Sequence, residues 1–258
     1  MAFGVVDKRV ESVALGEADA ARRRRALVEL LVGYGLILVV IWTPRPWQRG
    51  FYVAALLWIV AVTWRSFDGW RVMGLRVGGL LQSMWVVWVA LVLALVAVAL
   101  AARLGTLNRP PGAGLFVKTY WGYAIWSLMQ QFLLQDFVLL RVLRLVSSKR
   151  AAVAVAVGMF ALAHLPSPIL TVVTVVWGTA ACWLFLRYRN VFTLGLAHAV
   201  LGVCVAITVP GRVDHNMRVG LGYLRYHPGG MVHGHRSQSD HSVSTDEWVM
   251  ADDPMRRS

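Results

Sequence analysis

Carboxylates are scarce in this chain, and their scarcity limits the chemistry that its long apolar part can perform. The 258 residues include 13 aspartates and glutamates against 26 lysines and arginines, which gives a net charge of +13. Between residues 26 and 210 the acidic side chains are only those of Glu29, Asp68 and Asp136. A carboxylate-based mechanism in this segment therefore has to use one of these residues.

Cysteine and charge of either sign are also sparse. Charged residues make up 15% of the chain and hydrophobic residues 58%, whereas an average soluble domain is about half apolar and about one quarter charged. We therefore expect a polytopic membrane protein that folds as one domain. Cys182 and Cys204 both lie in apolar segments, so we expect no disulfide framework.

The positive charge is distributed as membrane topology requires. The arginines cluster in connections between apolar segments, and with a cytoplasmic N-terminus the inner connections carry more of them than the outer ones. This pattern favours contact with membrane lipid over binding of nucleic acid. We expect an integral membrane protein in a bacterial plasma membrane, with its N-terminus in the cytoplasm and no nucleic-acid partner.

The order of apolar segments predicts an all-α membrane bundle of seven or eight transmembrane helices. Residues 1–25 form a polar cytoplasmic segment, and residues 26–210 form the bundle. We expect membrane-embedded helices over roughly 26–42, 51–64, 79–102, 120–144, 151–163, 169–186 and 191–209. Residues 211–258 form a polar tail that we expect to be disordered from about residue 227. A solvated tail is favoured over a metal site at His233, His235 and His241.

Polar side chains interrupt the apolar helix expected over residues 120–144. Ser127, Gln131 and Gln135 recur every four residues, so they drift by only about 40° per step and form one stripe. Gln130 lies beside this stripe. In lipid such groups are costly unless they face a partner or a wet cavity. We therefore expect the stripe to meet polar groups from later segments.

Two histidines in later apolar segments, His164 and His198, are the expected partners. Phe160 shares a helix face with His164, since the two are one turn apart. A catalytic zinc site needs three protein ligands, and the chain has no H-E-x-x-H motif and no acidic residue near either histidine in sequence. We therefore expect no metal and no cofactor. A serine mechanism at Ser127 or Ser83 lacks an evident orienting carboxylate.

In order and spacing these residues resemble the CPBP family, the CAAX proteases and bacteriocin-processing enzymes, which are intramembrane glutamic endopeptidases. That family carries Glu-Glu-x-x-x-Arg, then Phe-x-x-x-His, then His-x-x-x-Asn or Asp. The matching positions here are residues 130–135, 160–164 and 198–202. Trp126 before the first motif, Pro166 after the second and Leu196 before the third strengthen the resemblance, which spans about residues 120–209.

The resemblance implies that a motif-one glutamate and the motif-two histidine activate a water molecule. The motif-three histidine and amide then stabilise the oxyanion, with no metal. In this chain both glutamates are glutamines, Gln130 and Gln131, the arginine is Gln135, and the last position is Gly202. A carboxamide does not take up a proton near neutral pH, so the first motif departs from the family at its reactive positions.

The remaining carboxylates are predicted to lie elsewhere. Asp136 lies about 140° around the helix from Gln131, at about 100° per residue, and we expect it to pair with Arg141 or Arg144. Glu29 is one turn from Arg25 near the cytoplasmic end of its helix, which favours a surface ion pair over catalysis.

Two functions from different classes follow. The first is an intramembrane endopeptidase that cuts a peptide or a membrane-protein terminus, with His164 as the base or water-orienting group and His198 as the oxyanion donor. The alternative is a catalytically inactive family member that binds or scaffolds membrane partners. A transporter is disfavoured, because its broken helices require interruptions inside paired spans, and here the breaks lie between spans.

Overall fold

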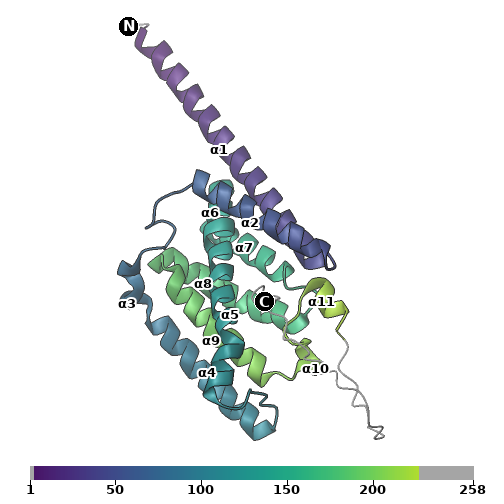
Figure 1. Ribbon diagram of the computed structural model, residues 1–258. Coiled ribbons are helices and arrows are strands. Elements are labelled where there is room, and N and C mark those ends of the chain that lie inside the picture. The colour runs from purple at the N-terminus through teal and green to yellow at the C-terminus, as the bar shows by residue number, and fades with distance from the viewer. Residues whose placement is uncertain (1–2, 227–258) are drawn as a thin grey trace, which may run out of the picture.

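The computed structural model describes residues 3–226, and their regular elements are all helices (Figure 1). This confirms the predicted all-α class. The predictions of a disordered tail and of a solvated histidine cluster at His233, His235 and His241 concern residues outside the described part of the chain.

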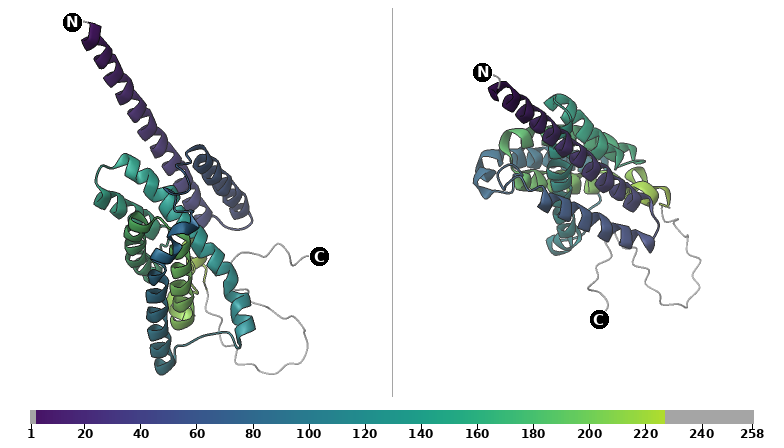
Figure 2. Two further views of the ribbon diagram at one scale, coloured as in Figure 1. Left: turned by 90° about the vertical axis from the view of Figure 1, so that its left-hand side faces the viewer. Right: turned by 90° about the horizontal axis from the view of Figure 1, so that it is seen from above.

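The first two helices form a hairpin on one side of the bundle. Helix α1 covers Phe3–Trp42 and α2 covers Trp47–Arg65, and the prolines between them end the first helix. The polar segment predicted for residues 1–25 continues into the apolar one without a break, since it contains no proline. As a result, the N-terminal part of α1 extends well beyond the bundle (Figures 1 and 2).

The span predicted for residues 79–102 is divided at its start. A single 3-10 turn, η1 (Val77–Gly79), leads into the short α3 (Leu80–Ser83), and the long α4 covers Trp85–Leu104. Helix α4 ends at Gly105, whose positive φ of 68° is readily adopted by glycine. The long connection that follows brings the chain to the helix with the polar stripe.

That helix is longer than predicted and irregular in the middle. Helix α5 covers Ala113–Phe132, a π-helical segment η2 covers Leu133–Leu139, and α6 covers Leu140–Leu145. Together they form one continuous rod through the molecule (Figure 1). The rod starts seven residues before the predicted position 120, at residue 113. Its centre is the best-buried part of the core, with Phe137 and Leu139 fully enclosed.

Three further helices complete the part of the bundle that carries the histidines. They are α7 (Lys149–Leu162), α8 (Pro168–Tyr188) and α9 (Val191–Thr208). Each begins at a side-chain cap: Ser148, Ser167 and Asn190 accept a hydrogen bond from a backbone N–H of the first turn. Helix α9 packs against both α4 and α5. The short α10 (Gly211–Asp214) and α11 (Gly220–Leu224) follow, and α11 contacts α1.

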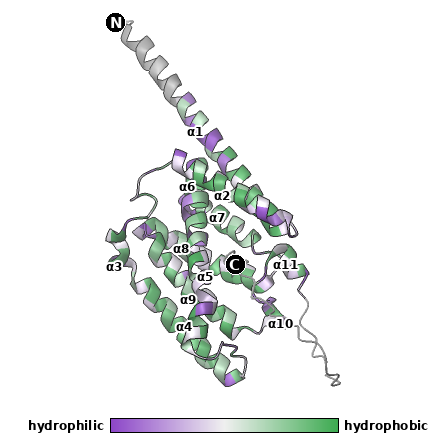
Figure 3. Ribbon diagram, in the orientation of Figure 1, coloured by the Kyte–Doolittle hydropathy of each residue, from purple (hydrophilic) through white to green (hydrophobic). Residues whose placement is uncertain are grey.

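The surface supports the membrane assignment. Among the residues that the structure describes, four helical stretches are long and apolar enough to cross a bilayer, namely Gly16–Trp42, Trp85–Leu104, Pro168–Tyr188 and Val191–Thr208. The helices of the bundle consist mainly of hydrophobic residues (Figure 3), and large apolar side chains such as those of Trp64, Leu81 and Val176 are exposed. In water a large exposed apolar surface would be unfavourable. The finer prediction of seven or eight transmembrane helices stays a prediction.

Candidate functional site

The polar stripe of the long rod is fully buried and makes a directed chain of hydrogen bonds. Gln135 Nε2 donates to Gln131 Oε1 at 3.2 Å, and Gln131 Nε2 lies 3.0 Å from His198 Nδ1 on α9. An amide nitrogen only donates, so His198 Nδ1 accepts and the ring proton is on Nε2. The chain therefore fixes one tautomer of His198 and leaves its Nε2–H as a hydrogen-bond donor.

His164 is held in the opposite tautomer to that of His198. It lies just beyond the end of α7, and its Nδ1 is 2.7 Å from the backbone oxygen of Phe160, one turn earlier. A carbonyl oxygen only accepts, so Nδ1 carries the proton and Nε2 keeps a free lone pair. The last turn of α7 and the following Pro166 thus present this histidine as an acceptor, whereas His198 is presented as a donor.

The Phe160 ring joins the two histidines. Its centroid lies 4.8 Å from that of His164 and 6.3 Å from that of His198, edge to face in both cases. Trp177 on α8 contacts the His198 ring as well, at 6.0 Å. The structure therefore brings together residues from all three sequence motifs, through Gln131, His164 and His198, with Phe160 between the last two.

Several polar atoms near this cluster lack a hydrogen bond within the described part of the chain. They are Ser127 Oγ, Gln135 Oε1 and the indole Nε1 of Trp177, all buried. Native proteins rarely leave buried polar groups unpaired, and such groups are commonly satisfied by water or a ligand. The cluster therefore has free hydrogen-bonding capacity next to a histidine whose own geometry is fixed.

The π-helical segment η2 was not predicted from the sequence. Its i→i+5 bonding widens the helix around Gln135, the last residue of the stripe, and such segments occur frequently at functional sites. The Gln135–Gln131 contact persists at the entry to this segment. No residue type in 133–139 distinguishes a π turn from an α turn, so the sequence carried no usable signal for it.

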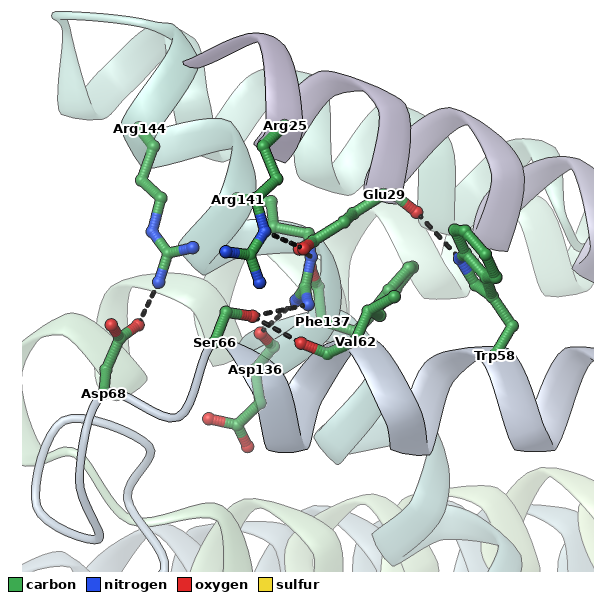
Figure 4. A network of polar contacts seen from close by, with 10 residues as sticks. All are labelled: Arg25, Glu29, Trp58, Val62, Ser66, Asp68, Asp136, Phe137, Arg141 and Arg144. Atoms are coloured by element: carbon green, nitrogen blue, oxygen red, sulfur yellow. Dashed lines mark hydrogen bonds and ion pairs between the residues drawn. The ribbon is translucent and has the colours of Figure 1, made fainter. Parts of the chain in front are cut away.

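Glu29 and Asp68 pair with arginines, not with the histidines, in a network that joins α1, α2 and α6 (Figure 4). Glu29 Oε1 is 2.8 Å from Arg25 Nε, and its Oε2 is 3.1 Å from Arg141 Nε. The predicted Arg25 pair is present and Arg25 is exposed, but Glu29 itself is buried, with only 5% of its surface exposed, where the sequence predicted a surface position. Long-range packing of α1 on α6 encloses it.

Asp136 makes neither of its two predicted ion pairs. Arg141 pairs with Glu29, and Arg144 pairs with Asp68. Arg141 Nη1 reaches only the backbone oxygen of Asp136, and the carboxylate points away from it (Figure 4). Both carboxylate oxygens are buried without a hydrogen bond to any residue that the structure describes. The prediction failed because the guanidinium of Arg141 is already held by α1.

Two motif positions, Gln130 and Gly202, have surroundings that the sequence did not predict. Gln130 is half-buried, and its side chain makes no hydrogen bond among residues 16–226. Gly202 is tightly covered, because a Cβ placed there would meet the hydroxyl and ring of Tyr123. Tyr123 was not singled out from the sequence, although it lies four residues before Ser127 and thus continues the stripe.

No group of three or more histidine, cysteine or acidic side chains able to hold a metal occurs in the described ranges. The two cysteines are free and buried. What the site offers instead is an imidazole donor, an imidazole acceptor and a row of carboxamides within an apolar helical bundle.

An apolar bundle of helices around a site of histidines and carboxamides is the arrangement expected for a membrane protein that resembles the CAAX proteases. Comparison with known families agrees. Residues 114–204 match the family model described as Type II CAAX prenyl endopeptidase Rce1-like. All three motifs fall within the match, which confirms the resemblance to the CPBP family over this segment. No curated protein and no solved structure matches the chain.

Proposed function

We propose that this CAAX-protease-like membrane protein binds an extended peptide or the terminus of a membrane protein at the histidine site, without hydrolysing it efficiently. The series of hydrogen bonds from Gln135 through Gln131 to His198 is the observation that carries the proposal. It fixes the His198 Nε2–H as a donor, and a main-chain carbonyl of a bound peptide is its natural acceptor.

The unpartnered polar atoms extend the same argument. Ser127 Oγ and Trp177 Nε1 can donate, and Gln135 Oε1 can accept. A peptide backbone presents both donors and acceptors at regular spacing, and inside a bundle each hydrogen bond that it completes removes an unfavourable buried polar group. The surrounding aromatic rings of Phe160 and Trp177 supply apolar contact for side chains.

The expectation of inefficient hydrolysis rests on which groups at the site can accept a proton. A general base contributes about 10²–10⁴-fold to the rate of such a reaction. Gln131 cannot take a proton, and its amide oxygen already accepts from Gln135. Glu29, Asp68 and Asp136 make no hydrogen bond to either histidine within residues 16–226.

A second candidate function, that of an intramembrane endopeptidase, is favoured by one specific observation. The Nε2 atom of His164 has a free lone pair, because Nδ1 donates to the Phe160 carbonyl. An imidazole in this tautomer can accept a proton from water, while His198 Nε2–H stabilises the oxyanion. In this reading His164 takes the role that a carboxylate otherwise has.

One experiment separates the two functions. The full chain is reconstituted in lipid nanodiscs and mixed with a panel of fluorescent apolar peptides, each with and without a C-terminal prenylated cysteine. Anisotropy reports binding and mass spectrometry reports cleavage. We expect binding that weakens in His198→Ala, and little cleavage. His215→Ala, which changes a histidine that stacks on Tyr223 and belongs to none of the three motifs, is the control. Cleavage that disappears in His164→Ala establishes the endopeptidase instead, and absence of binding by any peptide refutes both.

A further inference from the structure

The end of the Tyr123 side chain occupies the space of a missing side chain on the neighbouring helix. A Cβ added to Gly202 on α9 would have the Tyr123 hydroxyl oxygen, Cζ and Cε1 as its three nearest atoms, all in overlap. Helices α5 and α9 are in extensive contact. The tyrosine therefore reaches across from α5 and fills the position that residue 202 leaves open.

This position is close to the donor histidine. Gly202 follows His198 by one helical turn, and residues four apart have Cβ atoms about 5–6 Å from each other on the same face. The Tyr123 hydroxyl, which lies at the Cβ position of residue 202, is thus about one turn from the His198 side chain. Glycine itself offers only its backbone, whose N–H is used within the helix.

Within its own helix Tyr123 extends the polar stripe towards the N-terminus. It precedes Ser127 by four residues and Gln131 by eight. The Ser127 hydroxyl lies close enough to that of Tyr123 to interact with it, while Ser127 Oγ completes no hydrogen bond of standard geometry among the described residues. A tyrosine hydroxyl that interacts with Ser127 through its oxygen still has its own proton to donate.

We propose that Tyr123 is a ligand-binding residue whose hydroxyl donates to the same peptide carbonyl as His198 Nε2–H. The inference rests on the proposed function, because it assumes a peptide at this site. It adds a second donor, supplied by α5, to the one supplied by α9. Two fixed donors on one oxygen bind a carbonyl more tightly than either alone and orient it between the helices.

A purely structural role for Tyr123 makes a different prediction. If the ring only fills the space above Gly202, then Tyr123→Phe keeps the packing and leaves ligand binding unchanged. If the hydroxyl donates, the same substitution weakens binding by about 2- to 12-fold, the loss expected for one net hydrogen bond. Tyr120→Phe removes a hydroxyl from the same helix, one turn away, where the ring packs on Phe116, and is the matched control.

The test uses the panel peptide that wild-type protein binds most tightly in nanodiscs, synthesised with a single ¹³C carbonyl. Each carbonyl along the peptide is labelled in turn. We expect one position whose infrared stretch moves to lower frequency on binding, partly reversed in Tyr123→Phe and unchanged in Tyr120→Phe. A role in packing alone would not move this band.

A swap of the donor between helices provides an independent check. Gly202→Asn alone should weaken binding because its side chain meets the tyrosine, and Tyr123→Ala alone should weaken it by removing the donor. The double variant Tyr123→Ala with Gly202→Asn should recover binding relative to either single variant, since an amide then donates from α9.

The outcomes distinguish the two proposals. Binding that depends on His198 but is unchanged in Tyr123→Phe, with an unmoved carbonyl band, overturns the role of Tyr123 and leaves the proposed function standing. Lack of binding by every peptide of the panel overturns both.

Discussion

Arg141 Nε lies 3.1 Å from Glu29 Oε2, and both side chains are buried where α6 meets α1. The two residues are 112 positions apart in the chain. Ser66 from the end of α2 accepts a further hydrogen bond from Arg141 Nη2 at 3.2 Å. One guanidinium thus links the N-terminal hairpin to the rod that carries the polar stripe (Figure 4).

Removal of the acid should destabilise the fold strongly. Glu29→Leu leaves the Arg141 charge buried without its main partner, and breaking a buried pair typically costs about 3–5 kcal/mol. We expect a corresponding loss in the free energy of unfolding, measured by denaturant titration in detergent micelles. The double variant Glu29→Leu with Arg141→Met should recover most of it. Asp19→Ala removes an exposed pair with Arg22 and should change stability by less than about 1 kcal/mol. A small effect of Glu29→Leu would argue against a structural role of the pair.

Gly33 should not tolerate a side chain. A Cβ at this position would overlap the Phe137 ring, which inserts between α1 and the rod. Gly33→Ala forces the helices apart or the ring out of its rotamer, at a cost of about 1–3 kcal/mol. Gly35→Ala, where the added atom meets nothing within 4 Å, should instead stabilise the helix by about 0.5–1 kcal/mol. Thermal unfolding of both variants measures the contrast, and equal shifts would contradict this packing.

Restoring carboxylates at the first motif should favour hydrolysis. The variant Gln130→Glu with Gln131→Glu gives the site groups that can accept a proton. If the bound peptide and water share the site, we expect cleavage to rise by about 10²–10⁴-fold over wild type. Gln82→Glu places a glutamate at an exposed position of α3 and should have no effect. Wild-type cleavage already as fast as that of the double variant would refute the binding proposal.

Asp214, near the C-terminal end of the described residues, should make the stability of the protein depend on pH. It is 1% exposed, and burial raises its pKa above the ordinary value of 3.8, although hydrogen bonds from the Asn216 and Met217 backbone oppose the shift. A carboxyl with a raised pKa binds more protons in the folded than in the unfolded state. Stability therefore falls as the pH rises from the ordinary to the raised pKa.

Asp214→Asn keeps an acceptor oxygen for the Asn216 N–H but no longer ionises. We expect this variant to be more stable than wild type above that pH window and to show a flatter pH dependence of unfolding. Denaturant titrations across the window provide the measurement. A wild type that becomes more stable as the pH rises there, with the slope abolished in Asp214→Asn, would reverse the inferred sign.

Local pattern was sufficient for several features of this protein. The apolar composition predicted a helical membrane protein, and the four-residue spacing of Ser127, Gln131 and Gln135 predicted a single stripe. The motif order around His164 and His198 predicted a resemblance to the CPBP family, which the match over residues 114–204 confirms. These features depend on helical periodicity and on hydrophobic transfer, and both act on neighbouring residues along the chain.

The pairing of distant groups was decided only by the tertiary structure. Asp136 is close to Arg141 in sequence, whereas Glu29 is distant. Arg141 pairs with Glu29, because α1 packs against α6 and brings that carboxylate within reach. The same holds for Tyr123, whose hydroxyl fills the space above Gly202 because α5 and α9 approach closely there. The sequence by itself determined which residues are polar and which segments of the chain are apolar and helical. Which polar groups meet depends on helix packing, since a side chain in an apolar bundle is stabilised by whichever partner the neighbouring helix brings within reach.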